Sequence, residues 1–285
     1  SGATVFVDLN GNGVKDLGEP ETTTDAKGNF TFKSGESSVI NFGPIVASGG
    51  TDNSTGKLFS GTLTAPAGSD VVNPLTTLID QASKASGVSV ADAKKAVNTA
   101  LGLDSSTNLL KLDPLKIATG SASTTADKAL ALKIQAAAAQ VNTIVSQTAA
   151  TLTGAGASST SDSGIKSAYA ALADSVAAAS SSASTINLSS NTIISSLVKS
   201  AATHAGATVS QQAAIDSVAD NISTIITNLT TAIDTAVSSG SGSTPTIQKA
   251  LHEIVILAAG RAATQDELDL MLSLEGNGNW APLIN

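Results

Sequence analysis

The hydrophobic pattern of this 285-residue chain changes its period near residue 73, and this change limits the possible folds more than any other feature. Before it, short apolar or β-branched runs alternate with clusters of Gly, Asn, Asp and Ser, a pattern typical of strands and tight turns. After it, apolar residues recur every three or four positions, as in helices that pack through one face. We therefore predict an α+β protein, with a small β-sandwich-like module over residues 1–72 and an all-α helical bundle over residues 73–285.

The first region is expected to contain five or six short strands. The runs that predict them are TVFV, FTF, VINF, PIVA and KLFSGTL. A tight turn is expected at Lys27-Gly28 and another turn region at residues 52–56, because turn-forming residues cluster there. This number of strands suits a small sandwich or barrel-like module.

Capping residues mark where the helices of the second region should begin and end. Asn73 is a good N-cap and Pro74 suits the first helical position, where no backbone donor is needed, so a helix should run from there to Ser86. Further helices are expected at 90–101, from Pro114, and at 130–152, 161–182, 189–205, 210–238, 246–259 and 265–275. In the helix at 210–238 the predicted packing stripe is Ile215, Val218, Ile222, Ile225, Leu229, Ala232 and Ala236.

The composition argues against several classes of function. The chain has no cysteine, so we expect neither a disulfide framework nor thiol chemistry. Its net charge of −8 argues against a nucleic-acid binder, which normally carries a basic surface, and without a run of 18 apolar residues we expect no membrane-spanning segment. We also expect no enzyme, because the sequence has neither a Gly-x-Ser-x-Gly elbow nor a P-loop.

Residues 8–19, DLNGNGVKDLGE, place oxygen atoms at the spacing that a calcium-binding loop requires. They match the pattern D-x-[DN]-x-[DN]-G-x5-E, and calcium takes six to eight hard oxygen ligands. Gly13 permits the sharp bend that brings alternate side chains to one centre. Magnesium suits the loop less well, because it prefers a tighter octahedron and keeps its waters. The predicted ligands are Asp8, Asn10, Asn12, the backbone carbonyl of Val14, Asp16 and Glu19.

A second interpretation of the same loop is a solvated hairpin turn without a metal, since Asn and Gly are turn formers in their own right. The three carboxylates at ligand positions favour calcium over this alternative. With only three carboxylates, the loop should bind with moderate affinity, suited to the millimolar calcium found outside cells.

The wider stretch VFVDLNGNGVKDLGEPETTTDAKGNFTF resembles the calcium-binding B-repeat-type modules of bacterial surface adhesins. Their signature runs D-x-N-x-N-G-x-x-D-x-G-E-P and continues T-D-x-x-G-x-F/Y-x-F. The resemblance implies a β-strand before the loop and the ligand set given above. Asp25, in the matched T-D-x-x-G turn, would either join the site or only stabilise the turn. Here only residues 21–23 separate the two halves, which implies that one strand of the family is missing or displaced.

A second resemblance covers residues 45–120, which look like a junction between β modules and helices in very large secreted bacterial proteins of the repeat-toxin and adhesin type. Together the two resemblances imply a secreted or cell-surface bacterial protein. We expect a non-catalytic, calcium-stabilised structural segment for adhesion or for surface-layer or filament assembly. Its expected partners are calcium and either copies of itself or other surface components. The alternatives are a ligand- or glycan-binding module with a cavity between small-residue helices, and an accessory domain of an exported enzyme.

The remaining groups with potential chemistry are interpreted as structural. His204 and His252 lack a second histidine or a carboxylate at the helical spacing that a zinc site needs. Arg261 follows a glycine at an expected helix end, which favours a role as a cap, and Trp280 is expected to anchor the C-terminus on the bundle.

Overall fold

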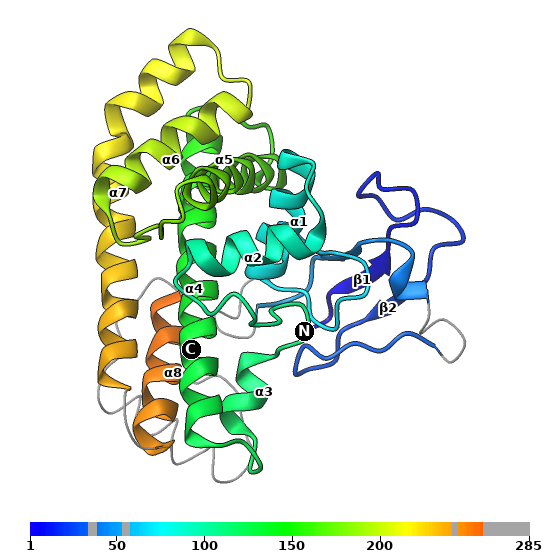
Figure 1. Cartoon of the computed structure of the whole chain (residues 1–285). Coiled ribbons are helices and arrows are strands. Elements are labelled where there is room, and N and C mark those ends of the chain that lie inside the picture. The colour runs from blue at the N-terminus through cyan, green and yellow to red at the C-terminus, as the bar shows by residue number, and fades with distance from the viewer. Residues whose placement is uncertain (34–38, 53–57, 241–243, 259–285) are drawn as a thin grey trace.

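The computed structural model describes residues 1–33, 39–52, 58–240 and 244–258 (Figure 1). Within these residues a four-stranded antiparallel sheet is followed by eight α-helices, so the chain is α+β as predicted. Figure 1 shows the sheet at one side of the helices, next to α1, while α4 and α7 run side by side through the length of the helical part.

The strand of the sheet with the most buried residues, β1, lies between two other strands. Its strand order is β2-β1-β3-β4, and every neighbouring pair is antiparallel. In β1 the residues Val5, Phe6 and Val7 are all buried, which explains why this run of apolar residues occupies an inner position. The strands are β1 Thr4–Val7, β2 Glu21–Thr23, β3 Ile45–Ser48 and β4 Thr62–Ala65.

The prediction of five or six strands was wrong for two of the runs. The FTF run at residues 30–32 forms no strand, and VIN forms a 3₁₀ helix, η1 Val39–Asn41. Phe32 instead packs with Val5, Val7 and Ile45 of the sheet, in one apolar cluster. In the described part of the module, irregular segments therefore cover the sheet. The sandwich-like prediction had required a second sheet in their place.

The short interval at residues 21–23 also differs from the expectation drawn from the resemblance. A strand was expected to be missing or displaced there, yet these three residues are β2, paired with β1 from Thr4↔Thr23 to Phe6↔Glu21. The loop of residues 8–20 thus connects the two strands of a β-hairpin.

The helices lie where the capping signals placed them, to within a few residues at most ends. Asn73, Ser89, Asp113 and Thr160 each accept hydrogen bonds from the first turn of the helix that follows. The helix predicted at 265–275 lies outside the described residues, as do Arg261 and Trp280. The bounds are α1 Pro74–Ser86, α2 Val90–Ala100, α3 Pro114–Thr119, α4 Thr125–Gly154, α5 Ser161–Ser181, α6 Asn191–His204, α7 Val209–Ser239 and α8 Thr244–Ala258.

The cap of α1 allows a matched test of helix capping in this protein. Asn73 Oδ1 accepts the backbone N–H groups of Leu75 (2.9 Å) and Thr76 (3.0 Å), whereas Ser190 at the start of α6 makes no side-chain cap bond. We expect Asn73→Ala to lower the free energy of unfolding by about 1 kcal/mol and Ser190→Ala to change it by only a few tenths. Urea denaturation followed by circular dichroism measures both, and equal losses would contradict the capping argument.

The core of the helical part is built largely from small side chains around α4. α4 packs against α3, α5, α7 and α8, and alanine fills six of its sixteen buried positions, with Ile134, Ile144 and Leu152 among the larger ones. Small residues let helices approach closely: a Cβ added at Gly164 of α5 would lie only 3.0 Å from the carbonyl oxygen of Ala149. The alanine-rich composition is therefore consistent with a packed bundle.

The predicted packing stripe of α7 was only partly right. Val218 is 39% exposed and Ile225 53% exposed, although both were expected to pack. Two apolar stripes with helical period run along this helix. The period of a stripe does not predict which of the two packs against a neighbouring helix. The stripe that packs on α4, α6 and α8 consists of Ile215, Ala219, Ile226, Ile233 and Ala236.

A seam of hydrogen bonds joins the sheet to the helices. β4 is an edge strand, and α1 covers its free side: the hydroxyl of Thr77 accepts the Thr64 N–H (3.0 Å), and the Thr76 hydroxyl donates to the Thr64 carbonyl (3.0 Å). The Thr64 hydroxyl donates to Asp80 Oδ2 (2.7 Å), which also pairs with Lys84 Nζ (2.7 Å). The predicted boundary at residue 72 falls between β4 and α1, so this seam crosses it.

Tyr169 of α5 extends the seam into the bundle. Its hydroxyl is buried and shares a hydrogen bond with the side chain of Thr77, and burial raises the pKa of this phenol well above its usual range. Thr77 therefore contacts β4 on one side and α5 on the other.

Candidate metal centre

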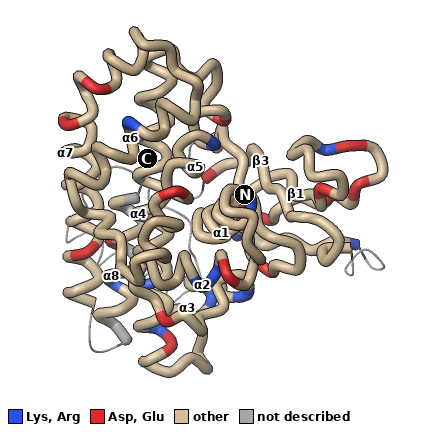
Figure 2. The backbone as a smooth tube through the Cα atoms, turned by 45° about the horizontal axis from the view of Figure 1, so that its top comes forward, with Lys and Arg blue, Asp and Glu red and all other residues tan. Residues whose placement is uncertain are grey.

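The predicted calcium loop, residues 8–19, connects β1 to β2 at the end of the sheet that points away from the helices. Figure 2 shows its acidic residues in the loop at the far right. Two backbone hydrogen bonds fix its base: Val7 N–H donates to Pro20 (3.1 Å) and Asp8 N–H donates to Pro44 (2.9 Å). Gly43 touches the Asp8 carbonyl so closely that a Cβ there would overlap it, so this glycine is required for the loop to sit on β3.

Asp8 organises the first half of the loop from a buried position. It is only 2% exposed, and its two oxygens accept the backbone N–H groups of Gly11 (2.7 Å), Asn12 (3.2 Å) and Gly13 (2.7 Å). Gly11 and Gly13 have φ values of +76° and +75°, which turn these N–H groups inward and which other residues rarely adopt.

Glu19 closes the loop from its other end. It is 8% exposed, with Oε1 accepting the N–H of Leu9 (2.8 Å) and Oε2 accepting the N–H of Asp16 (2.9 Å). One carboxylate therefore holds both the beginning and the last turn of the loop in place.

Asp16 gathers the two asparagine side chains. Its Oδ2 accepts hydrogen bonds from the amides of Asn10 (2.6 Å) and Asn12 (2.7 Å), and these bonds are the main reason that the pKa of Asp16 is lowered. Lys15 lies beside this group: its Nζ donates to the Asp16 carbonyl (2.7 Å) and lies 3.6 Å from Glu21. Three of the predicted ligand side chains thus meet at one oxygen atom.

The predicted ligands are therefore in one loop but form two groups. Asn10, Asn12 and Asp16 meet at the outer side, whereas Asp8 and Glu19 are buried against backbone N–H groups. Val14 is 62% exposed, and its N–H donates to Asn12 Oδ1 (2.7 Å). Over the described ranges, no three His, Cys, Asp or Glu side chains are gathered closely enough to hold a metal ion.

The donor set nevertheless fits a hard cation such as calcium. All the predicted ligand atoms are oxygens, and a carboxylate offers about four lone-pair sites, of which the hydrogen bonds named above use three at Asp8 and two at Glu19. The nitrogen and oxygen of an Asn amide have nearly the same shape. Rotation of the amides of Asn10 and Asn12 would bring their oxygens next to Asp16 Oδ2, and the backbone N–H groups of Asn12 and Val14 would then give up their present bonds to these oxygens.

Asp25 holds its own turn. Its Oδ1 accepts the backbone N–H groups of Lys27 (2.8 Å) and Asn29 (2.8 Å), and the amide of Asn29 donates to Oδ2 (3.0 Å). The side-chain hydrogen bond from Asn29 is the largest cause of the lowered pKa of Asp25. Of the two roles left open by the sequence, these bonds account for stabilisation of the turn.

The histidines are placed as follows. His204 Nε2 lies 2.7 Å from Asp174 Oδ2, so it links the end of α6 to α5. His252 belongs to α8, and its side chain is outside the described set. Among the helices that the structure describes, none combines the length and the apolar character needed to cross a membrane.

A group of polar residues between the helices was not predicted from the sequence. Gln140 of α4 bonds to Asp234 of α7 (2.8 Å), and Ser189 bonds to the same carboxylate (2.6 Å). A lone glutamine in the run AAAAQV was a signal for Gln140, but nothing near Asp234 in the sequence pointed to it.

Comparison with known proteins adds no assignment. No protein-family model matches the chain, and no curated protein or solved structure is significantly similar to it. The resemblance to calcium-binding adhesin modules therefore rests on the sequence motif alone.

Proposed function

We propose that residues 8–19 bind one calcium ion and that the chain is a non-catalytic structural segment of a secreted or cell-surface bacterial protein. The observation that carries this proposal is the meeting of Asn10, Asn12 and Asp16 at one oxygen atom, in a loop that Asp8 and Glu19 hold closed. Such a constellation at the tip of a hairpin is rich in the oxygens that calcium prefers.

The six predicted ligands would hold the ion. When bound, calcium supplies a cross-link between the two ends of the loop, which stiffens the β1–β2 hairpin. The chain's own contribution is to keep the loop close to the required curvature through the bonds of Asp8 and Glu19 and through the glycines at positive φ. Less conformational entropy is then lost when the ion binds.

A stiff loop affects the helices through the sheet. β1 pairs with β3, β3 pairs with β4, and the Thr64–Thr77–Asp80 seam connects β4 to α1. Each step is a set of hydrogen bonds with fixed direction, so calcium at the hairpin would help fix the orientation of the sheet against the bundle. This is the property that a stalk or an assembly subunit needs.

The proposal includes assembly of copies of this chain on the cell surface in the presence of calcium. Analytical ultracentrifugation and negative-stain electron microscopy, each in millimolar calcium and in excess chelator, test it. We expect larger species or ordered assemblies in calcium only, and magnesium at the same concentration serves as the control. Strictly monomeric behaviour in every condition would remove the assembly role and leave that of a monomeric stalk.

A further inference from the structure

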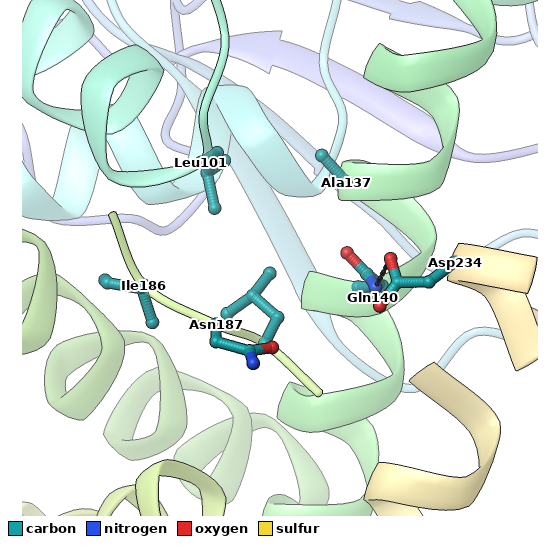
Figure 3. A pocket seen from close by; sticks show the side chains of 7 residues that line it. Leu101, Ala137, Gln140, Ile186, Asn187 and Asp234 are labelled. Atoms are coloured by element: carbon teal, nitrogen blue, oxygen red, sulfur yellow. Dashed lines mark hydrogen bonds between the residues drawn. The ribbon is translucent and has the colours of Figure 1, made fainter. Parts of the chain in front are cut away.

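A small cavity lies between α4, α7 and the segment that joins α5 to α6 (Figure 3). Its volume is about 160 Å³, and it opens to solvent near Asp234 and Asn187, which are exposed. Leu101, Ala137, Ile186 and Leu188 line it together with Gln140, Asn187 and Asp234, and most of the surface that the cavity leaves accessible is polar. At roughly 30 Å³ for each water molecule, the space would hold about five waters or a ligand of similar size.

The polar side of the cavity is built around a buried glutamine. Gln140 is 7% exposed, and its Nε2 donates to Asp234 Oδ1 (2.8 Å) and to the Thr230 carbonyl (3.2 Å). Figure 3 shows the amide oxygen of Gln140 on the cavity side, turned away from Asp234. Because both amide protons are used, the group that Gln140 offers to the cavity is a hydrogen-bond acceptor.

The carboxylate of Asp234 is held in place but not neutralised. Ser189 donates to its Oδ2 (2.6 Å), and Gln140 donates to its Oδ1, which leaves further lone pairs on both oxygens. No ion pair found in the described part of the chain involves Asp234, and the cavity lining contains no lysine or arginine. Asn187 also lines the opening, and its oxygen accepts the Ser189 N–H (2.9 Å).

We propose that this cavity binds a small primary alkylammonium ion. The ammonium group would donate to Gln140 Oε1 and to the Asp234 carboxylate, where charge-assisted hydrogen bonds are strong, while the short alkyl chain lies beside Leu101, Ala137 and Ile186. A chain of about four carbons matches the volume of the cavity. This site is independent of the calcium loop and goes beyond the structural role proposed above.

The test uses n-butylammonium chloride as the probe, titrated into the ¹⁵N-labelled full chain at pH 7 and constant ionic strength. An alkylammonium with a pKa near 10.4 is charged at this pH. We expect saturable amide shifts around residues 137–140, 186–189 and 230–234, and binding of n-butanol at least about tenfold weaker, since it lacks the charge. Nα-acetyl-lysine N-methylamide, which keeps a free ε-ammonium group, is titrated in parallel. It shows whether the site also accepts the side chain of a lysine residue. Saturable binding of either probe at these residues supports the site.

Two variants and one control complete the test. We expect Asp234→Asn to weaken binding at least about tenfold, and Ala137→Leu, which fills the cavity without touching the carboxylate, to abolish it. Asp216→Asn removes one charge elsewhere on α7 and should leave binding unchanged. Amide shifts that never saturate would overturn the proposal, and so would equal binding by the wild type and by a folded Asp234→Asn variant. If Asp234→Asn does not fold, unchanged binding by Ala137→Leu would overturn it.

Discussion

Calcium at about 10 mM should raise the melting temperature of this protein by roughly 3–10 °C relative to excess chelator. Extracellular calcium modules bind with a Kd of about 10⁻⁴–10⁻³ M, and a ligand at ~10–100 times its Kd adds about 1.4–2.7 kcal/mol of stability. For a chain of this size, each 1 kcal/mol shifts the melting temperature by about 2–4 °C. Circular dichroism melting curves measure the effect, with magnesium as the control ion.

The loop variants should separate calcium binding from the intrinsic stability of the loop. Asp16→Asn should remove most of the calcium-dependent shift but leave the curve in chelator almost unchanged, because Asp16 is only half-buried and its side chain bonds only to the two asparagine amides. Asp8→Ala should also lower the stability in chelator by about 1–3 kcal/mol, because it leaves N–H groups of the loop without their acceptor.

Asp104→Asn is the matched control for these variants. Asp104 is another carboxylate whose pKa is lowered by a neighbouring side chain, here Ser106, but it lies in the connection after α2. It should keep the full calcium-dependent shift. If wild type melts at the same temperature in calcium and in chelator, or if Asp104→Asn loses the shift as Asp16→Asn does, the loop is not the origin of any calcium effect.

Thr77→Val should lower the free energy of unfolding by about 1–3 kcal/mol, in calcium and in chelator alike. Valine has nearly the same shape as threonine, but it leaves the Thr64 N–H without its acceptor and the buried Tyr169 hydroxyl without its partner. Both groups lie at the seam between sheet and bundle, where water does not easily replace the lost bond. Urea denaturation followed at 222 nm measures the change.

The control for the seam is Thr119→Val at the end of α3. The Thr119 hydroxyl bonds to the carbonyl of Leu115 in an exposed position, so its loss should change stability by no more than about 0.5 kcal/mol. Equal effects of the two substitutions would show that the seam does not hold the sheet on α1.

The helices could be predicted closely because their signals are local. Asn73-Pro74 at the start of α1 and Gly87 at its end, with φ +62°, decide the bounds of that helix through contacts within one turn. The covering of the sheet could not be predicted in this way. Phenylalanine is common in strands, so the sequence around Phe32 predicts one. Only the packing of the complete module decides that Phe32 covers the sheet face instead of pairing at an edge.

In the candidate metal centre, too, the local features could be predicted from the sequence and the features that depend on the folded loop could not. The spacing of oxygens from Asp8 to Glu19 is a local pattern, and the strand before the loop followed from its β-type residues, whereas the second strand of the hairpin, β2, was not predicted. The inward turn of backbone N–H groups onto Asp8 and Glu19 depends on the φ angles of the loop, which spacing does not reveal. The bond between Gln140 and Asp234 joins residues 94 positions apart, and no local pattern predicts such a pair.

Isothermal titration calorimetry of calcium into the chelator-treated protein is the most direct measurement of the central claim. The account predicts a saturable isotherm with about one ion per chain and a Kd of about 10⁻⁴–10⁻³ M, lost in Asp16→Asn and retained in Asp104→Asn. An isotherm without saturable heat at several millimolar calcium, in protein whose circular dichroism confirms the fold, would contradict it.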